Sequence, residues 1–352
     1  MDAQKVEALN NESKILVIQT AFLGDAILTL PMLKKLRDRN PEAQIDVLAI
    51  PSTTEIFSAA SYVDNVIVMD KRGKQKGIRA LNKFVKELKA NSYTKVFSPH
   101  RSFRSAYIMI RLSGDESYGF DNSSFRYAFK NLVKYEQKYH EVQRNISLIG
   151  ENVDADSWKI KPEISIDEAI ENNVDNFISN NNLNSGFISI APGSVWETKR
   201  YPKVNYIELI KLLTNKNETV VVIGSDDDSI LCNEIASNFS SNVLSVAGKF
   251  SVTGTICLLK YSKLLITNDS APTHMGMCAD IPVLTIYCST VSDFGFYPYN
   301  DKSQFVSYNE LDCKPCGIHG YDECPVKTYD CGYKLLPAEI FAITEQMIKT
   351  NG

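Results

Sequence analysis

The stretch 14-KILVIQTAFLGDAILTLPML-33 joins a short apolar run to a longer apolar segment through a glycine and an acid. Residues 14–18 have the length and composition of a buried strand, and residues 27–37 have the length of a helix. Asp25 stands where the strand gives way to the helix. A carboxylate at this position is favoured by the helix dipole, and it is also available as a base at the mouth of a site. The stretch alone leaves both roles open.

The same alternation of strand and helix continues through the chain in two series. In the first series, the expected strands are residues 15–18, 45–50, 66–69 and 95–97, and the expected helices are residues 27–37, 53–60, 77–90 and 103–112. In the second, the strands are residues 187–191, 219–223, 243–246, 264–267 and 283–286, with helices at 204–213, 228–237, 252–259 and from about residue 273. Such alternation predicts parallel, doubly wound sheets. We therefore expect an α/β protein with two Rossmann-like domains whose sheets face a central cleft.

The alternation breaks between residues 113 and 185, and this break suggests a domain boundary. The segment is aromatic-rich at first and ends in the asparagine-rich run 172–186, which is typical of a helix end and a linker. We expect an N-terminal domain over residues 1–175 and a C-terminal domain over residues 186–335. A last helix is expected within residues 336–352, where isoleucines recur with helical spacing.

The composition is that of an ordinary globular protein, with 44% hydrophobic and 23% charged residues in a chain of 352. No apolar run approaches the roughly 18 residues that span a membrane. The first 13 residues are polar and acidic, unlike a signal peptide. We therefore expect a soluble, cytoplasmic protein.

Charge is distributed unevenly along the chain. Residues 1–150 contain 23 Lys and Arg against 16 Asp and Glu, a net charge of +7, and the remaining residues contain 15 against 26, a net charge of −11. The excess is concentrated in a basic stripe, which contains one acid, Glu87, and the cations Lys71, Arg72, Lys74, Lys76, Arg79, Lys83, Lys86, Lys89, Lys95, Arg101, Arg104 and Arg111. The stripe is either a surface that faces an anion or the solvated face of a helix.

Four unusual loops follow expected strands, at the edge where open α/β sheets bind their ligands. The first contains Asp25. The second, 191-APGSVWETKRYP-202, leaves strand 187–191 with exposed backbone N–H groups near Ser194 and with the positive charge of Lys199. This combination suits a diphosphate, although a plain surface loop is the alternative.

The third and fourth loops open helices. In 224-GSDDD-228 the acids are either helix caps or partners for ribose hydroxyls, and Asp228 is the candidate for the ribose. In the fourth loop, 268-NDSAPTH-274, small residues let a ligand approach the N–H groups at the helix start. The helix dipole, the Ser270 hydroxyl and His274 could hold an anion together. A buried His274 with an ordinary hydrogen bond is the alternative.

Several familiar motifs are missing from the sequence. It contains no GxxxxGK[ST], no GxGxxG after the first strand, no GxSxG and no HExxH. P-loop hydrolysis, dehydrogenase chemistry, serine hydrolysis and zinc proteolysis therefore lose their main support. A late cluster of cysteines indicates a structural metal, reduced thiols or an ordered loop, and these alternatives stay open: Cys313, Cys316, Cys324 and Cys331.

Taken together and in this order, the loops resemble the sequence blocks of glycosyltransferase family 9, the ADP-heptose:lipopolysaccharide heptosyltransferases. The resemblance rests on ILVIQTAFLGDAILTLP, APGSVWETKRYP, GSDDD, LLITNDSAPTHMGMCADIPVLTIYCST and the late CKPCG and CP elements, which span nearly the whole chain. The NDS and PGS forms are closer to the heptosyltransferase II branch than to the I branch. One departure is Ala271-Pro-Thr-His274, where some members have Gly-Leu-x-His. Because proline lacks an N–H donor, the phosphate contacts must be distributed differently.

The resemblance implies a GT-B fold with an N-terminal acceptor-binding domain, a C-terminal domain that binds a nucleotide-sugar, and a helix within 336–352 that crosses back to the N-terminal domain. It implies inverting transfer of a heptose from ADP-heptose to the inner core of lipopolysaccharide, with no metal and no cofactor. Asp25 would be the general base. The other implied site residues bind the diphosphate, the sugar or the ribose of the donor: Ser194, Lys199, Asp228, Asp269, Ser270, Ala271 and His274.

The basic stripe, together with Arg144, would face an anionic glycolipid acceptor at the inner face of the cytoplasmic membrane. Each cation contributes about 1 kcal/mol near an anionic leaflet, so we expect peripheral contact with the membrane. We expect no nucleic-acid partner. Two alternatives remain. A nucleotide-sugar 2-epimerase of the same fold would convert the donor alone. An anion- or nucleic-acid-binding module would use the stripe, although few aromatic residues lie between Lys71 and Lys95.

Overall fold

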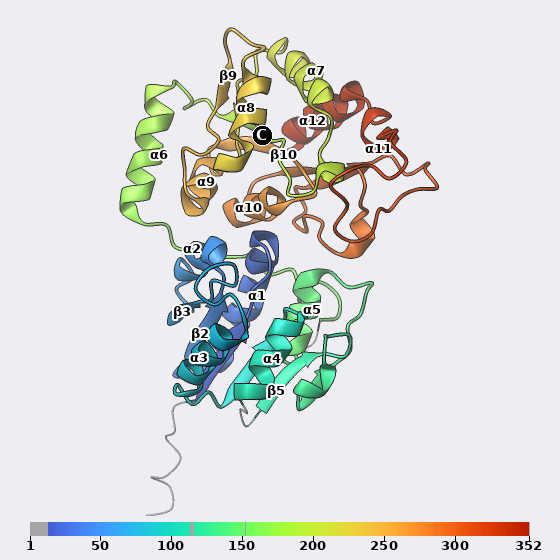
Figure 1. The fold of residues 1–352 in the computed structure, drawn as a ribbon. Coiled ribbons are helices and arrows are strands. Elements are labelled where there is room, and N and C mark those ends of the chain that lie inside the picture. The colour runs from blue at the N-terminus through green and yellow to red at the C-terminus, as the bar shows by residue number, and fades with distance from the viewer. Residues whose placement is uncertain (1–12, 113–115, 152, 352) are drawn as a thin grey trace, which may run out of the picture. The chain divides into compact units, whose positions relative to one another are not determined.

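The computed structural model describes residues 13–112, 116–151 and 153–351, which form two compact units. In each unit a sheet is covered by helices (Figure 1). This arrangement confirms the expected α/β fold with two Rossmann-like parallel sheets.

The boundary between the units lies earlier than expected. The second unit begins at Ser165 and also includes the short segment Gln137–His140, whereas Glu141–Ile164 belongs to the first unit. The expected boundary at residue 175 falls within helix α6 (Glu168–Asn180). That helix belongs to the second unit because it packs against α9 (Val252–Leu259) of that unit.

The first unit contains a six-stranded parallel sheet in the order β3-β2-β1-β4-β5-β6. Its strands are β1 (Lys14–Ile18), β2 (Gln44–Ala49), β3 (Asn65–Val68), β4 (Lys95–Ser98), β5 (Glu116–Phe120) and β6 (Asn131–Val133). Strand β1 is central, since Ile15 lies between Ile45 and Lys95 of its two neighbours. Its apolar side chains are buried on both faces, as a central parallel strand requires. The strand order is that of a Rossmann sheet, whose ligands bind at the carboxyl ends of the strands.

Helices cover this sheet and bury its apolar faces. They are α1 (Leu23–Arg39), α2 (Thr54–Ser58), α3 (Ile78–Lys89), α4 (Phe103–Leu112) and α5 (Glu141–Leu148), with short 3-10 helices η2 (Pro51–Thr53) and η3 (Arg126–Ala128). Helix α1 begins at Leu23, so Asp25 lies in its first turn. Helix α5 packs against α1, and the side-chain amide of Asn145 donates to the carbonyl oxygen of Leu28 over 3.1 Å.

The second unit repeats the same strand order, β12-β11-β10-β7-β8-β9, again in parallel. The strands are β7 (Phe187–Ala191), β8 (Val220–Val222), β9 (Val243–Ser245), β10 (Ser262–Asn268), β11 (Val283–Tyr287) and β12 (Gln304–Ser307). The helices after α6 are α7 (Lys203–Thr214), α8 (Ser229–Ala236), α9 (Val252–Leu259), α10 (Ala271–Ala279), α11 (Asp330–Tyr333) and α12 (Pro337–Asn351), with 3-10 helices η4 (Glu197–Lys199), η5 (Asp226–Asp228) and η6 (Ser292–Phe294).

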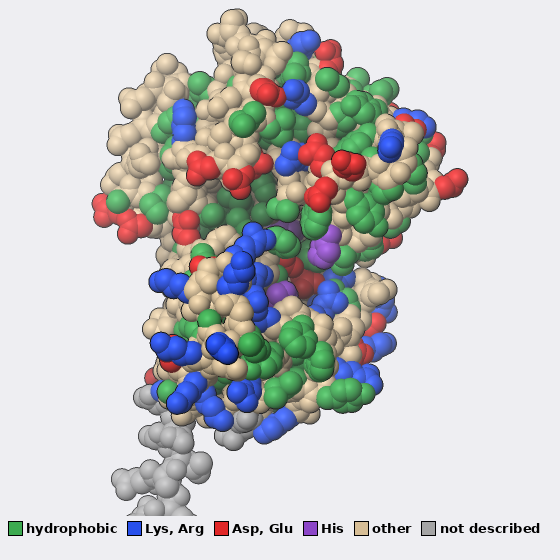
Figure 2. Space-filling model, in the orientation of Figure 1, with side chains coloured by type: hydrophobic (Ala, Val, Ile, Leu, Met, Phe, Trp, Pro, Cys, Tyr) green, Lys and Arg blue, Asp and Glu red, His purple; other side chains and the backbone are tan. Residues whose placement is uncertain are grey.

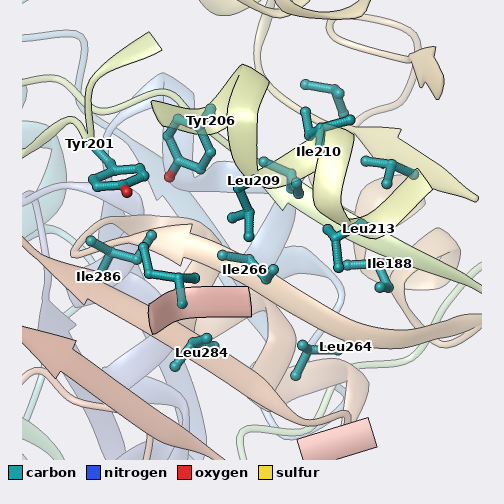
Figure 3. Close-up of a cluster of buried hydrophobic side chains, with 14 of the residues drawn as sticks. Ile188, Tyr201, Tyr206, Leu209, Ile210, Leu213, Leu264, Ile266, Leu284 and Ile286 are labelled. Atoms are coloured by element: carbon teal, nitrogen blue, oxygen red, sulfur yellow. The ribbon is translucent and has the colours of Figure 1, made fainter. Parts of the chain in front are cut away.

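Helix α7 supplies one wall of the core of the second unit. Its residues Tyr206, Leu209, Ile210 and Leu213 recur with helical spacing and therefore lie on one face. Figure 3 shows these side chains above Ile266 and its neighbours on the sheet. Burying each such side chain contributes about 1.5–3 kcal/mol, so this face fixes the helix on the sheet.

Helix α12 packs into the same core, where Ile340 and Met347 are buried. It contacts α7 and β10 and belongs to the second unit. The apolar face of α12 is covered by its own unit, and that packing fixes the helix there. The expectation that a helix within 336–352 crosses back to the N-terminal domain stays a prediction.

Three strands and two helices were not expected from the sequence: β5, β6, β12, α5 and α11. The strands are short, and β6 and β12 are edge strands with exposed side chains. Their sequences lack an apolar run of their own, so periodicity gives no signal. They form because the neighbouring strand offers a row of backbone hydrogen-bonding groups.

Candidate functional site

Asn268, the last residue of β10, holds the loop that follows β7. Its buried side-chain amide donates to the carbonyl oxygens of Pro192 (2.7 Å) and Gly193 (3.3 Å). Its Oδ1 atom accepts from the backbone N–H of Tyr201 (2.9 Å) and from the hydroxyl of Tyr206 (2.9 Å). Both N–H donors and the oxygen acceptor of the Asn268 amide are used. The loop of residues 191–202 and the loop of residues 268–274 are therefore fixed to each other. Sequence reasoning assigned Asn268 no role.

Lys199 and Asp269, both predicted site residues, form a largely buried ion pair. The Nζ atom of Lys199 lies 2.7 Å from Oδ2 of Asp269, and the hydroxyl of Thr290 donates to the same oxygen over 2.7 Å. An ammonium group has three N–H donors, so this pair leaves Lys199 with the capacity to bind an anion. Thr290 follows β11 in the segment YCST, and it was not predicted.

Ser270 and Ala271 lie where the sequence predicted them, at the start of α10. Ser270 is the N-cap residue, and Pro272 lies in the first turn. The Ser270 hydroxyl is 3.4 Å from the carbonyl oxygens of Gly193 and Asn268. The positive end of the helix dipole therefore lies beside the loop that carries Lys199.

His274 is buried one turn into α10, with 4% of its surface exposed. Its Nδ1 atom has no hydrogen-bond partner among the described residues. Burial lowers the pKa of His274 to about 4. The negative charge of Asp269 raises this pKa and the positive charge of Lys199 lowers it, both more weakly than burial does. The imidazole is therefore neutral at neutral pH, with one ring nitrogen left for a ligand.

Asp228 is a helix cap in the structure. Its Oδ2 atom accepts from the backbone N–H (3.0 Å) and the hydroxyl (2.7 Å) of Ser225, which completes a capping box. The same carboxylate lies against Gly193, because a Cβ atom at Gly193 would collide with it. The third loop therefore meets the second, and the ribose role of Asp228 stays a prediction.

Arg200 joins two other residues of the second loop. The Nε atom of Arg200 donates to the carbonyl oxygen of Ser194 over 2.9 Å, and its guanidinium pairs with Glu197 at 2.7 Å. Ser194 is thus placed by its backbone, while its side chain is partly exposed. The diphosphate role of Ser194 stays a prediction.

Thr198, which precedes Lys199, is held by the late segment that carries the cysteines. Its N–H donates to the carbonyl oxygen of Tyr321 (3.0 Å), and its Oγ1 atom accepts from the N–H of Tyr321 (2.8 Å) and the hydroxyl of Ser289 (3.1 Å). Gly320 permits this approach, since its φ is +79° and a Cβ atom there would lie 2.8 Å from Oγ1 of Thr198. This Thr198–Tyr321 clasp positions Lys199, a role that no local pattern indicates.

The four late cysteines are free thiols in the structure: Cys313, Cys316, Cys324 and Cys331. Burial raises the pKa of Cys331 to about 11 and also raises that of Cys316, which favours the protonated thiol. Within the ranges that the structure describes, no three His, Cys, Asp or Glu side chains gather closely enough to hold a metal ion.

In the first unit, Asp25 lies in the first turn of α1, directly after the central strand β1. The side chain of Gln19 donates to the hydroxyl of Thr29 (2.8 Å), which in turn donates to the carbonyl oxygen of Asp25 (2.8 Å). These bonds tie the end of β1 to the start of α1. Asp25 thus lies at the carboxyl edge of the sheet, where the sequence predicted it.

Two arginines lie over the ring of Tyr135, with Arg101 at 4.0 Å and Arg144 at 4.7 Å from the ring centroid. Burial raises the pKa of Tyr135 to about 12, and the negative charges of Glu141 and Asp25 contribute in the same direction. Arg144 is 2% exposed and pairs with Glu141 at 2.8 Å. It is therefore part of the interior, which corrects the expectation that it extends the basic surface.

Lys71 and His100 meet at the carboxyl edge of the same sheet. The Nζ atom of Lys71 donates to the carbonyl oxygen of Thr20 (2.8 Å), and the Thr20 hydroxyl lies 2.8 Å from Nδ1 of His100. Burial lowers the pKa of Lys71, and the positive charges of Arg104 and Arg72 lower it further. Burial, with a smaller effect of Lys71, lowers the pKa of His100 to about 4. Crowded positive charges of this kind favour an anionic ligand.

The rest of the basic stripe is different in character. On α3, Lys83 is exposed and lies 4.0 Å from the single acid of the stripe, Glu87. Figure 2 shows Lys and Arg side chains spread over the surface of the first unit. Part of the stripe is therefore a solvated helix face, and part gathers around Lys71.

A search of the described helices finds none that is long and apolar enough to cross a membrane. The sites described above lie at the carboxyl ends of the parallel strands in each unit. This is where open α/β sheets bind ligands.

Comparison with known proteins shows which family this chain matches. Residues 81–324 match the model of glycosyltransferase family 9 (heptosyltransferase). The chain is 26% identical to lipopolysaccharide heptosyltransferase 2 of Salmonella typhimurium, over 80% of this chain and 84% of that protein. It is also 26% identical to lipopolysaccharide heptosyltransferase 3 of Escherichia coli, over 82% and 88% of the two chains.

Solved structures agree with the observed fold. ADP-heptose lps heptosyltransferase II of E. coli superposes with a TM-score of 0.77 at 21% identity, covering 96% of this chain and 99% of that one. The family 9 glycosyl transferase of Veillonella parvula superposes with a TM-score of 0.83 at 21% identity, covering 96% and 98%. The fold is thus the GT-B type expected from the sequence. The chain belongs to glycosyltransferase family 9 and is a glycosyltransferase.

Proposed function

We propose that this protein transfers a heptose from ADP-heptose to the inner core of lipopolysaccharide, with inversion at the anomeric carbon and without a metal ion. The Lys199–Asp269 pair at the start of α10 carries the proposal. An ammonium group and a helix N-terminus supply fixed positive charge where a diphosphate would leave. The names of the curated relatives support the sugar and the acceptor, and one structural neighbour is an E. coli heptosyltransferase solved with ADP, at a TM-score of 0.71.

In the second unit, each predicted residue has one role in binding the donor. Lys199, Ser194 and the N–H groups at Ser270 and Ala271 bind the diphosphate and stabilise its charge as it leaves. Asp269 and the Nδ1 atom of His274, which has no partner among the described residues, orient the sugar and phosphates, and Asp228 binds the ribose. Because His274 is neutral, it adds a hydrogen bond without repelling Lys199.

In the first unit, Asp25 is the general base. The acceptor hydroxyl gives its proton to the Asp25 carboxylate while its oxygen forms a bond to the anomeric carbon. The bond from that carbon to the diphosphate oxygen breaks on the opposite face, so ADP leaves and the configuration inverts.

The acceptor is an anionic glycolipid, and the group of Lys71, His100 and Arg104 supports this assignment. Anionic groups of the acceptor would neutralise charges that otherwise repel one another. We propose that the protein works in the cytoplasm, in peripheral contact with the inner membrane.

Incubation of the purified protein with ADP-heptose and a heptose-deficient core acceptor tests the proposal. We expect sugar transfer that EDTA does not reduce, and an inverted anomeric configuration by NMR. Asp25→Asn should lower kcat by about 100-fold or more, as loss of a general base does. Asp38→Asn, an exposed acid on the same helix, is the matched control and should leave kcat unchanged.

Other outcomes point to the alternatives. Conversion of the donor without an acceptor would indicate a 2-epimerase, and steeply salt-dependent binding of DNA or RNA would indicate a nucleic-acid-binding module. Equal kcat values for wild type and Asp25→Asn would remove Asp25 from the mechanism. In a thermal-shift screen, ADP should stabilise the protein more than UDP or GDP, because a ligand that binds only the folded state raises the apparent stability.

A further inference from the structure

Three large aromatic side chains are exposed together on the first unit. Phe103 is 57% exposed, Phe125 59% and Tyr127 86%. The rings of Phe103 and Phe125 contact each other edge to face, with centroids 5.0 Å apart. Single exposed apolar residues are common on any protein, whereas apolar side chains that are exposed next to one another are typical of interaction surfaces. We call these three residues the aromatic patch.

Two elements of the first unit hold the patch in place. Phe103 begins α4, and Phe125 precedes η3, which packs on α4 and contains Tyr127. The N–H of Ser124 donates to the carbonyl oxygen of Arg101 over 3.0 Å, which joins the loop before η3 to the loop before α4. Ile110, two turns after Phe103 on α4, is 51% exposed and extends the apolar surface. The patch is therefore part of a folded surface and not a loose loop.

Phe125 has a backbone conformation that is unusual for a bulky residue. Its φ is +52°, in the left-handed region that bulky residues rarely adopt. Glycine or asparagine would occupy this position with less strain. The Phe125 ring is exposed, so its burial within this unit does not offset the energetic cost of this backbone conformation.

Positive charges accompany the aromatic rings. Arg104 adjoins Phe103, Arg126 lies between Phe125 and Tyr127, and Arg111 adjoins Ile110. Figure 2 shows hydrophobic side chains gathered over the region of α4, with Lys and Arg side chains at the margins. Aromatic rings suit the boundary between lipid head groups and acyl chains, and arginines beside them suit anionic head groups.

We propose that the aromatic patch is the surface by which this protein sits on an anionic lipid bilayer. The inference rests on the proposed function in that its acceptor is a glycolipid. Phe103, Phe125 and Tyr127 enter the head-group region, and Arg104, Arg111 and Arg126 pair with lipid phosphates. Contact through so few rings is reversible, as a peripheral enzyme requires.

Vesicle co-sedimentation of the full chain tests the inference. Vesicles of phosphatidylcholine with about one third phosphatidylglycerol should bind the protein, and vesicles of phosphatidylcholine alone should bind it weakly. Phe103→Ser with Phe125→Ser should weaken binding about tenfold or more, because two rings no longer leave water. Tyr127→Ser should weaken it less, and at 86% exposure this change cannot disturb the core.

The matched control is Val204→Ser with Ile230→Ser, two exposed apolar residues of the second unit, which should bind vesicles as wild type does. Phe125→Trp should show a blue-shifted emission on anionic vesicles only. Equal vesicle binding by wild type and the Phe103, Phe125 variant would overturn the inference, as would equal binding to neutral and anionic vesicles. Dimerisation in sedimentation velocity that the patch variant abolishes, with vesicle binding unchanged, would assign the patch to self-association instead.

No nucleotide enters this experiment, so its result is independent of the transfer assay. Failure of wild type to transfer heptose would remove the proposed function whatever the vesicles show. An unchanged midpoint of urea denaturation in the patch variant would show that the variant is folded.

Discussion

Lys199 Nζ and Asp269 Oδ2 lie 2.7 Å apart in a pair whose side chains are 14% and 9% exposed. The two residues come from different loops of the second unit, one after β7 and the other after β10. A pair so sheltered from solvent is sensitive to the loss of one partner, since the remaining charge keeps its desolvation cost.

Removing the lysine should therefore destabilise the second unit. We expect Lys199→Ala to lower the free energy of unfolding by about 3 kcal/mol, as for other broken buried pairs, and to weaken ADP binding. Urea denaturation and calorimetric titration measure the two effects. Lys263→Ala is the control, because its pair with Glu218, at a similar distance of 2.8 Å, is more exposed and should contribute less than about 1 kcal/mol. Similar losses for the two variants would contradict this prediction.

The buried imidazole of His274 should make stability depend on pH. Its pKa in the folded protein is lowered to about 4 from 6.5, so the unfolded chain binds the proton first as pH falls. Stability should be complete above pH 6.5 and decrease by about 3 kcal/mol in total toward pH 4. His100, whose pKa is also lowered to about 4, adds to the same decrease.

Replacing His274 with Gln should flatten this dependence. Urea denaturation of wild type and His274→Gln at pH 7.5, 6.5, 5.5 and 4.5 would measure it. Because His100 still titrates in the variant, about half of the slope should remain. Parallel curves for the two proteins would show that His274 is not protonated in this window.

Two glycines of the late segment provide a test of the Thr198–Tyr321 clasp. Gly320 and Gly317 both have a positive φ, at +79° and +71°, so alanine strains the backbone at either position. Only at Gly320 would the new Cβ atom press on Thr198, at 2.8 Å; at Gly317 its one neighbour is the Tyr321 hydroxyl, at 4.0 Å. Gly320→Ala should weaken ADP binding about tenfold, and Gly317→Ala should not.

The mechanism of this loss is also testable. If Thr198 acts through Lys199, Gly320→Ala should cause no further loss of ADP affinity in a Lys199→Ala background. Calorimetric titration of the two single variants and the double variant would complete the cycle. A loss of the same size in both backgrounds would mean that the late segment contacts the nucleotide independently.

Two buried tyrosine hydroxyls should behave differently when they are removed. The hydroxyl of Tyr93 donates to Oδ2 of the buried Asp46 over 2.6 Å, whereas the hydroxyl of Tyr135 has no hydrogen-bond partner among the described residues. Tyr93→Phe should lower the free energy of unfolding by about 1.5–3 kcal/mol, because a bond to a charged group is lost. Tyr135→Phe should change it by less than about 0.5 kcal/mol, since the ring and its two arginines remain. Equal changes in chemical denaturation would contradict the assignment.

Most elements of the fold were predictable because they repeat a local pattern. Residues 252–259 were expected to be a helix and form α9, and the strand expected at 187–191 is β7. In these segments apolar residues recur with the period of the element, so neighbours along the chain carry the signal. The edge strands β6 and β12 carry no such signal, because they form by pairing with a strand already in place.

The candidate site divides in the same way. The sequence placed Asp25, Ser270 and Ala271 correctly at helix starts, since small residues, acids and Pro near a strand end are local features. It could not show that Arg144 turns inward to Glu141, because burial depends on what packs against α5.

The sequence by itself therefore determined the parallel sheets, the helix starts and the loops that follow the strands. Only the tertiary structure decided that Lys199 pairs with Asp269, that Thr198 is held by Tyr321, and that Nδ1 of His274 finds no hydrogen-bond partner in the described part of the chain. The physical reason is distance along the chain. Secondary structure follows from neighbours a few residues apart, whereas Thr198 and Tyr321 are 123 residues apart and meet only after the whole sheet has formed.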